Sequence, residues 1–313
     1  MHPPIEPFAT GLLPVGDGNA IYWETSGNPA GAPVLYLHGG PGGGVKTGYR
    51  RRADPERHLV VGFEQRGCGR SRPLATEDPD RLATNTTQAL IADAEALREH
   101  LGVQRWLLHG VSWGTTLALA YAQAHPERVS ALVLMATGLT SAAEVRWMTQ
   151  DVGRLFPEQW QRFHDAGAPR PGQRLVDAYH EKITGADEQV RAAAVRAWLA
   201  WEDAHVSLVP GGHPVAQPAD PGWQEVFATL VVHYWKHAAF LPEGALLEGL
   251  HRVTHLPVTF VQGRYDVSGP PDVAWRLHRA WPGSRFVLVD DEGHGGAGMV
   301  RAVEEAIAAR TAG

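Results

Sequence analysis

Residues 107–114 read LLHGVSWG, and this stretch limits the possible folds more than any other part of the chain. An apolar run ends at a serine between two glycines, and the residues that follow, TTLALAYAQAH, are typical of a helix. A strand-to-helix turn of the form G-x-S-x-G makes a serine protrude, because the glycines remove the Cβ atoms that would clash. The start of the helix also points free N–H groups toward the serine. The pattern therefore predicts that Ser112 is a nucleophile; the competing interpretation is an ordinary turn serine.

Strand-like runs alternate with helical segments on both sides of this turn. The chain begins like a β-hairpin, with Asp17-Gly18 as the turn dipeptide. Further strands are predicted at 34–39, 58–67, 106–110, 129–136, 258–263 and 285–290, and helices at 85–101, 114–125, 271–281 and from about 297. Parallel strands need crossover connections of this kind, so the alternation predicts an α/β fold with a mostly parallel, doubly wound sheet.

The alternation stops at about residue 138 and resumes at about residue 250. No strand-like run lies between these points; the segment instead contains helical stretches such as 187–204 and six of the eleven tryptophans. We therefore expect an α/β core made of residues 1–138 and 250–313, with residues 139–249 inserted as a helical cap.

A serine hydroxyl becomes an effective nucleophile only beside a base, and that base needs a third group to orient it. In this architecture the acid and then the histidine should follow the serine, each at the end of a later strand. Asp266 stands in the loop GRYD after one predicted strand, and His294 in the loop DEGHGG after the last one. The sequence thus predicts a catalytic triad of Ser112, Asp266 and His294.

Two other carboxylates compete with Asp266 for the acid role. Asp290 and Asp291 belong to the strand that delivers His294. They are too near His294 in the sequence to approach its ring easily, so Asp266 is the preferred acid.

Acyl transfer also needs two donors aimed at the developing oxyanion. One should be the backbone N–H of Trp113, the residue after the nucleophile, and the other should come from a loop after an early strand. The loop HGGPGGG (38–44) lets the backbone approach a ligand closely. Gly40 is the first candidate for the second donor, and Gly44 is the alternative.

The same loop invites a phosphate-binding interpretation. GPGGGVKT (40–47) misses the pattern G-x-x-x-x-G-K-[ST] by one residue, because Val45 stands where a glycine is required. A β-branched residue disfavours the positive φ expected there, so the sequence argues against a nucleotide site. His233/His237 and His251/His255 each have the i, i+4 spacing of a helix face. Neither pair has the glutamate of H-E-x-x-H, so we expect no metal and no other cofactor.

Composition narrows the class of partner and the compartment. The formal net charge is −6, which argues against nucleic-acid or anionic-membrane binding. Cys68 is the single cysteine, so no intrachain disulfide forms, which fits a reducing compartment. We expect no signal peptide and no transmembrane helix, and hence a cytoplasmic protein. Whether the chain is a monomer or a homo-oligomer stays open.

The motifs taken together resemble the proline iminopeptidase family of α/β-hydrolases. The matching stretches run along nearly the whole chain: HGGPGGG (38–44), EQRGCGRS (64–71), GVSWGTTLALAYAQAHPERV (110–129), AWLAWE (197–202), GRYD (263–266) and GH (293–294). The resemblance implies an α/β-hydrolase core with a helical cap, and cofactor-free release of an N-terminal residue, preferably proline, from peptides. It also implies the triad already assigned from the residues.

The resemblance assigns a substrate-binding role to the cap as well. In the family a glutamate after a tryptophan binds the free amino terminus of the substrate, and here that step is Trp201-Glu202. A carboxylate in a tryptophan-lined pocket pairs strongly with an ammonium group. The competing interpretation places Glu202 on the solvent face of its helix.

Several positions depart from the family pattern. Val231 replaces a second pocket glutamate, Met135 and Gly138 replace an arginine and a phenylalanine, and Gly269 replaces a cysteine. Glu64 replaces the aspartate of D-Q-R-G, where we expect only a structural effect. The catalytic machinery is therefore kept while much of the proline pocket is changed.

Three functions follow from this comparison. The first is a serine aminopeptidase that releases proline or another small apolar residue. The second is an esterase or amidase that uses the same triad on small acyl groups, which the loss of the second carboxylate favours. The third is a non-catalytic binding module, against which the intact serine, aspartate and histidine argue.

Overall fold

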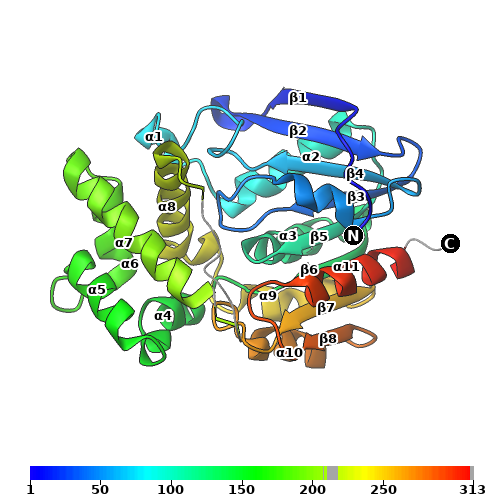
Figure 1. The fold of residues 1–313 in the computed structure, drawn as a ribbon. Coiled ribbons are helices and arrows are strands. Elements are labelled where there is room, and N and C mark those ends of the chain that lie inside the picture. The colour runs from blue at the N-terminus through cyan, green and yellow to red at the C-terminus, as the bar shows by residue number, and fades with distance from the viewer. Residues whose placement is uncertain (207, 210–217, 311–313) are drawn as a thin grey trace.

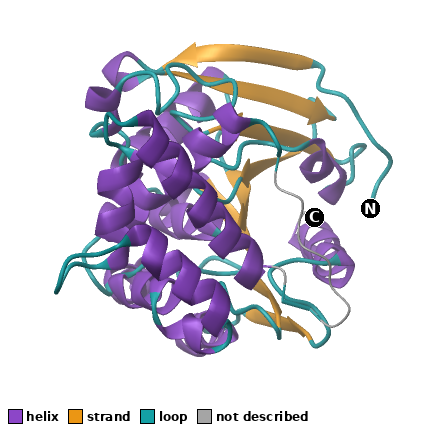
Figure 2. Ribbon diagram, turned by 60° about the vertical axis from the view of Figure 1, so that its left-hand side comes forward, coloured by secondary structure: helices purple, strands orange, loops and turns teal. Residues whose placement is uncertain are grey.

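The computed structural model describes residues 1–206, 208–209 and 218–310, and these form one eight-stranded sheet flanked by helices (Figures 1 and 2). The strand order is β1-β2-β4-β3-β5-β6-β7-β8. Pairing is antiparallel for β1·β2 and β2·β4 and parallel from β4 to β8. The predicted mostly parallel α/β sheet is confirmed.

The strands, in chain order, are β1 (Ala9–Pro14), β2 (Ala20–Gly27), β3 (Ala32–Leu37), β4 (His58–Glu64), β5 (Trp106–Val111), β6 (Val129–Met135), β7 (Val258–Gly263) and β8 (Arg285–Val289). The helices are α1 (Pro79–Leu82), α2 (Thr87–His100), α3 (Trp113–Ala124), α4 (Ala142–Thr149), α5 (Pro157–Gly167), α6 (Leu175–Ile183), α7 (Glu188–Val206), α8 (Pro221–Lys236), α9 (Ala245–Glu248), α10 (Pro271–Ala280) and α11 (Ala297–Arg310). Short 3₁₀ turns include η2 (Thr47–Arg52), η5 (Ala238–Phe240) and η6 (Gly249–Arg252).

The turn between β1 and β2 has the backbone that its dipeptide favours. Asp17 and Gly18 both adopt positive φ, at 60° and 69°. Two successive left-handed residues match the right-handed twist of the flanking strands, which is why Asp-Gly is common in such hairpins. The predicted hairpin is therefore present.

Side chains of the central strands alternate between two apolar layers. On β6, Leu132 and Leu134 pack in the cluster that contains α2, α3 and α10, whereas Val133 and Met135 pack in the cluster that contains α11. This period of two buries both faces of the sheet, as helices on both sides require. The sheet is thus held rigidly, and the loops at the carboxyl ends of its parallel strands share one edge.

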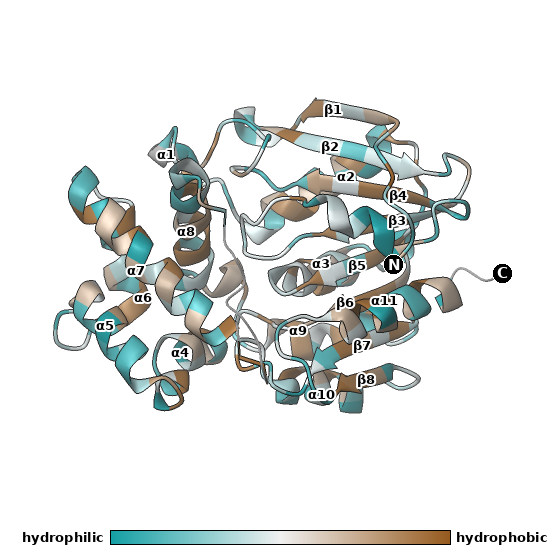
Figure 3. Ribbon diagram, in the orientation of Figure 1, coloured by the Kyte–Doolittle hydropathy of each residue, from teal (hydrophilic) through white to brown (hydrophobic). Residues whose placement is uncertain are grey.

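Helices α4 to α8 lie together at one side of the sheet, between β6 and β7 in the chain (Figure 1). They share a third apolar cluster, and in Figure 3 hydrophilic and hydrophobic residues alternate along α5 and α7, as expected of amphipathic helices. Helix α8 packs against both this cluster and the core of the sheet. Phe227 and Val231 face the cluster, whereas Leu230 and Tyr234 face the core of the sheet. The turns η5 and η6 and helix α9 contact α2 or α3, so the chain returns to the core directly after α8.

Candidate active site

Ser112 occupies a strained turn between β5 and α3. Its backbone has φ 54° and ψ −126°, a region that non-glycine residues rarely adopt. The two flanking glycines make this turn sterically possible. A Cβ at Gly110 would lie 2.5 Å from the carbonyl oxygen of Gly114, and a Cβ at Gly114 would overlap the carbonyl oxygen of Leu37 on β3. Helix α3 therefore starts directly against the sheet, with Ser112 at its N-terminus.

Gly114→Ala is expected to destabilise the protein because the added methyl group has no space between α3 and β3. Forcing extra atoms into a packed interior costs about 1–3 kcal/mol, and here the obstacle is backbone. We expect the free energy of unfolding in urea to fall by about 3 kcal/mol. Gly16→Ala, with open space around the new methyl group, is the control and should shift stability by less than about 0.5 kcal/mol. Equal stability of the two variants would contradict this account of the turn.

The three predicted triad residues lie together at the carboxyl ends of three strands. The Ser112 hydroxyl is 2.9 Å from Nε2 of His294. Nδ1 of His294 lies 2.9 and 3.0 Å from the two carboxylate oxygens of Asp266. Because a carboxylate can only accept, Nδ1 carries the proton and Nε2 is left to accept the hydrogen bond from the serine. This is the hydrogen-bond sequence that general-base activation of a serine requires.

Asp266 is held by its own loop and by a residue that the sequence analysis did not identify. One oxygen accepts hydrogen bonds from the backbone N–H groups of Ser268 and Gly269, at 3.0 and 2.9 Å. The other accepts from Nε2 of Gln262 at 2.9 Å. Gln262 is fully buried on β7, and a lone amide in the apolar run VTFVQG was a usable signal for this role. The competing carboxylate Asp290 instead pairs with Arg264 at 2.6 Å.

Two opposing effects determine the pKa of His294. Burial lowers the pKa of His294, but the charge of Asp266 and its hydrogen bond outweigh the burial, so the pKa lies above its usual value. An imidazole made more basic by a buried carboxylate is better able to take the serine proton.

The glycine-rich loop lies against the nucleophile. A Cβ at Gly39 would come within 3.0 Å of the Ser112 Cβ. Gly40 adopts a φ of 115°, and a Cβ there would lie 2.8 Å from the amide nitrogens of Gly42 and Gly43. Gly40 and Trp113 line the same small cavity as Ser112. The loop therefore brings a backbone N–H close to the serine where a side chain would not fit.

Trp113 is held by a buried neighbour, whereas Gly44 lines the larger cavity and not the small one beside Ser112. The indole of Trp113 donates to Oε1 of Gln65 at 2.9 Å, and the amide of Gln65 donates to the carbonyl of His38 at 3.0 Å. Gln65 thus links Trp113, at the start of α3, to His38, at the start of the glycine-rich loop, and fixes the positions of these two segments beside Ser112.

Glu202 reaches the catalytic cavity from α7. It is 8% exposed and lines the same cavity of about 460 Å³ as Ser112 and His294. Burial raises the pKa of Glu202 to about 7, although a hydrogen bond from Trp198 opposes the rise. That bond joins Nε1 of Trp198 to Oε1 at 2.6 Å. The second oxygen of Glu202 has no hydrogen-bond partner among the described residues, so it is available to a ligand.

The structure corrects the direct role expected for Trp201. Its side chain is buried, stacks on Phe163, and donates a hydrogen bond to the carbonyl of Met148 at 3.0 Å. Trp201 is not among the residues that line the cavity beside Ser112. Successive helix residues point about 100° apart, so Trp201 anchors α7 in the cap cluster while Glu202 faces the cavity.

The positions that depart from the family pattern have different surroundings. Gly138 and Gly269 line the small cavity, of about 60 Å³, next to Ser112. Met135 instead lines a separate cavity that His294 also lines, and Val231 is fully buried in the cap cluster. Glu64 pairs with Arg70 at 3.0 Å. Two of the departures therefore change the surface beside the nucleophile itself.

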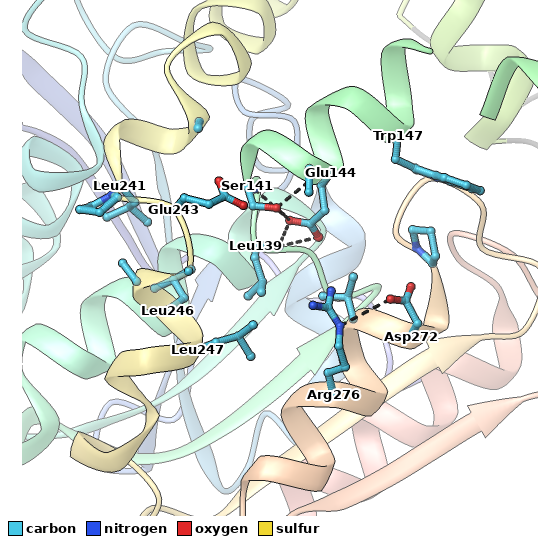
Figure 4. Close-up of a pocket in the computed structure, with 17 residues that line it drawn as sticks. Leu139, Ser141, Glu144, Trp147, Leu241, Glu243, Leu246, Leu247, Asp272 and Arg276 are labelled. Atoms are coloured by element: carbon cyan, nitrogen blue, oxygen red, sulfur yellow. Dashed lines mark hydrogen bonds and ion pairs between the residues drawn. The ribbon is translucent and has the colours of Figure 1, made fainter. Parts of the chain in front are cut away.

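A second cavity, of about 420 Å³, lies away from the serine between α4, α9 and α10 (Figure 4). Its wall is largely apolar and includes neither Ser112 nor His294. The carboxylate of Glu144 is already used there, because it accepts hydrogen bonds from the backbone N–H groups of Leu139 and Ser141. Arg276 lies 3.5 Å from Asp272. Glu144 is thus satisfied by the backbone, and Arg276 and Asp272 pair with each other.

The described part of the chain contains no group of three or more histidine, cysteine, aspartate or glutamate side chains that could hold a metal ion. His233 lies on α8, and His237 directly follows the last residue of that helix. Nε2 of His233 is already used, because it forms a hydrogen bond with the carbonyl of Asn85 at 2.9 Å. His251 belongs to η6, and His255 lies beyond it, so these two share no helix. In the same ranges no helix is long and apolar enough to cross a membrane.

The sheet, the serine turn and the order of Ser112, Asp266 and His294 along the chain are those of an α/β-hydrolase. The model of the α/β-hydrolase fold family matches residues 32–296. Solved structures agree at the level of the fold: an esterase from Exiguobacterium antarcticum has a TM-score of 0.64 with 22% sequence identity, covering 97% of this chain and 100% of that one. A proline iminopeptidase from Mycobacterium smegmatis has a TM-score of 0.60 with 18% identity, covering 97% and 99%.

Sequence relatives identify the branch within this fold. A probable proline iminopeptidase from Streptomyces coelicolor is 45% identical over 94% of this chain and 92% of its own length. A proline iminopeptidase from Arabidopsis thaliana is 42% identical over 94% and 77%, and one from Neisseria gonorrhoeae is 40% identical over 91% and 90%. The chain belongs to the proline iminopeptidase family of α/β-hydrolases and is a hydrolase.

Proposed function

We propose that this protein is a serine aminopeptidase that releases an N-terminal proline or another small apolar residue from peptides. The observation that carries the proposal is a buried carboxylate, Glu202, in the same cavity as the Ser112–His294 pair. An aminopeptidase must recognise an ammonium group beside the bond that it cleaves, and a half-satisfied carboxylate in a buried site does so strongly. The names of the sequence relatives support the same activity.

Catalysis follows from the hydrogen bonds at the triad. Ser112 attacks the carbonyl carbon of the N-terminal residue while Nε2 of His294 takes the hydroxyl proton. The same nitrogen then donates this proton to the leaving amine, and the acyl group stays on Ser112. A water molecule, deprotonated by His294, hydrolyses the ester and restores the serine. Asp266 stays ionised, fixes the imidazole tautomer, and stabilises the imidazolium that forms in each step.

The backbone N–H groups of Trp113 and Gly40 form the oxyanion hole in this proposal. Neither amide donates a hydrogen bond to a described residue, and both residues line the cavity at Ser112. Gly44 is less suited because it does not line the small cavity beside Ser112. Two fixed donors at the developing negative charge supply a large share of the rate enhancement in acyl transfer.

In the proposed complex, residues 139–249 act as the cap that completes the substrate pocket. Glu202 on α7 and Trp235 on α8 face the serine from the cap side. The acyl pocket beside Ser112 is small, at about 60 Å³, and is lined mainly by apolar or small residues. The geometry therefore favours a compact apolar N-terminal residue. The single cysteine, Cys68, which is buried and unpaired, is consistent with a cytoplasmic location.

A substrate panel tests the proposal. Proline, alanine and leucine p-nitroanilides with a free amino group should be cleaved, and N-acetylation of the same anilides should abolish cleavage. Short p-nitrophenyl esters, which lack the amino group, form the comparison arm. If the esters were cleaved and none of the free-amino anilides were, the protein would be an esterase of small acyl groups.

A further inference from the structure

A second space adjoins the catalytic cavity at His294, which lines both. This space, of about 900 Å³, shares Lys46, Arg52 and His294 with the cavity that holds Glu202. Its wall also includes Arg301 on α11. Among the described residues, none of the side chains that line this second space is a carboxylate. Two adjoining cavities that share His294 therefore contain a carboxylate, the nucleophile and three cations on their walls.

Arg52 is held in this wall by neutral groups. Its guanidinium donates to Nε2 of His109 at 2.9 Å and lies 5.6 Å from the centre of the Tyr36 ring. Nδ1 of His109 lies 3.1 Å from the carbonyl of Val133, which can only accept, so Nδ1 carries the proton and Nε2 accepts from Arg52. Burial and the charge of Arg52 lower the pKa of His109 to about 3, so the ring stays neutral at physiological pH.

The positive charge of Arg52 is therefore positioned but not neutralised. No carboxylate within the described ranges pairs with Arg52. Lys46 and Arg301 likewise form no ion pair and no side-chain hydrogen bond with a described residue. Arg52 is half-buried, whereas Lys46 and Arg301 are exposed at the edge of the cavity. Three cations on a wall whose described residues include no carboxylate create a positive potential that attracts an anion.

We propose that Arg52, Lys46 and Arg301 form a carboxylate-binding subsite on the leaving-group side of the active site, so that the preferred substrates are short peptides with a free C-terminal carboxylate. This proposal rests on the proposed aminopeptidase function. Glu202 would hold the ammonium end and the three cations the carboxylate end.

The position of His294 indicates which half of the substrate enters this subsite. His294 must give its proton to the leaving amine, and it lines both cavities. The residues after the scissile bond therefore extend past His294, toward Lys46 and Arg301. A peptide spans at most about 3.3–3.6 Å per residue, so the terminal carboxylate of a di- or tripeptide stays near the triad while that of a long peptide does not.

The test compares peptides that differ only in where they carry an anion. Pro-Ala, Pro-Ala-amide and Pro-Glu-amide are assayed at low salt in the wild-type protein, in Arg52→Gln, and in the double variant Lys46→Gln/Arg301→Gln. We expect kcat/KM for Pro-Ala to exceed that for Pro-Ala-amide by about tenfold, the size of one good charge-assisted contact. That ratio should fall toward one in the variants and at high salt. Arg252→Gln, at an exposed arginine of η6 outside the cavity, should keep it.

The three peptides distinguish a subsite for the terminal carboxylate from a subsite for an acidic side chain. If kcat/KM for Pro-Glu-amide exceeds that for Pro-Ala-amide by as much as kcat/KM for Pro-Ala does, the subsite binds an acidic side chain, and the terminal-carboxylate proposal is overturned. A wild-type ratio near one, or variants that keep the full ratio, also overturns it. Binding of the same peptides to Ser112→Ala, measured by calorimetry, gives the preference without turnover. Failure of every free-amino anilide would contradict the proposed function instead, whereas equal calorimetric affinities for Pro-Ala and its amide would contradict only the subsite.

Discussion

Ser112→Ala is expected to lower kcat for anilides and esters by about 10⁵-fold or more, the size of effect seen when the nucleophile of a triad is removed. The reason is that His294 and Asp266 activate only this hydroxyl, which is the group at 2.9 Å from Nε2. Alanine fits the same space, so the fold should persist. Steady-state assays give the rate, and thermal unfolding reports the fold.

Ser130→Ala is the matched control because Ser130 is an exposed serine at the start of β6. It should keep wild-type activity and reaction with a fluorophosphonate probe, whereas Ser112→Ala should lose both. Labelling of Ser112→Ala by the probe would show that another residue is the nucleophile. Loss of activity in both variants would point instead to damage of the sheet.

The grouping of Ser112, Asp266 and His294 could be predicted from the sequence because the topology brings these residues together. Ser112, Asp266 and His294 each follow a strand, and β5, β7 and β8 run parallel, so their carboxyl ends meet at one edge of the sheet. A pattern of strands and loops is sufficient for that inference. The core of the fold was predictable for the same reason, since apolar runs of strand length are separated by helices.

The contacts between distant elements could not be predicted in the same way. The pairing of Arg52 with His109 joins η2 to β5 and depends on which face of the strand the histidine takes. The roles of Trp201 and Glu202 differ by one helical step, and only the packing of α7 decides which of them faces the cavity. Gly44 satisfied the loop pattern, yet it does not line the small cavity beside Ser112. Each of these outcomes depends on tertiary packing more than on local sequence.

Glu202→Gln is the second substitution with a large expected effect, and it separates recognition from chemistry. Glutamine keeps the shape and removes the charge that would face the substrate ammonium. We expect kcat/KM for proline anilide to fall by about 100-fold or more, because removing one partner of a buried charge pair costs about 3–5 kcal/mol. Hydrolysis of short esters, which carry no ammonium, should change by less than about threefold. Glu188→Gln, at an exposed position at the start of α7, is the control.

The pH dependence of this variant provides an independent readout. Because burial raises the pKa of Glu202 to about 7, its carboxylate form is lost as the pH falls below neutrality. Wild-type kcat/KM for anilides should therefore decrease toward acid pH more steeply than kcat/KM for esters, which depends on His294 alone. In Glu202→Gln the two profiles should have the same acid limb. A wild-type protein whose anilide and ester profiles already coincide would show that Glu202 does not bind the amino terminus, and the selectivity for peptides would have to come from the leaving-group side of His294.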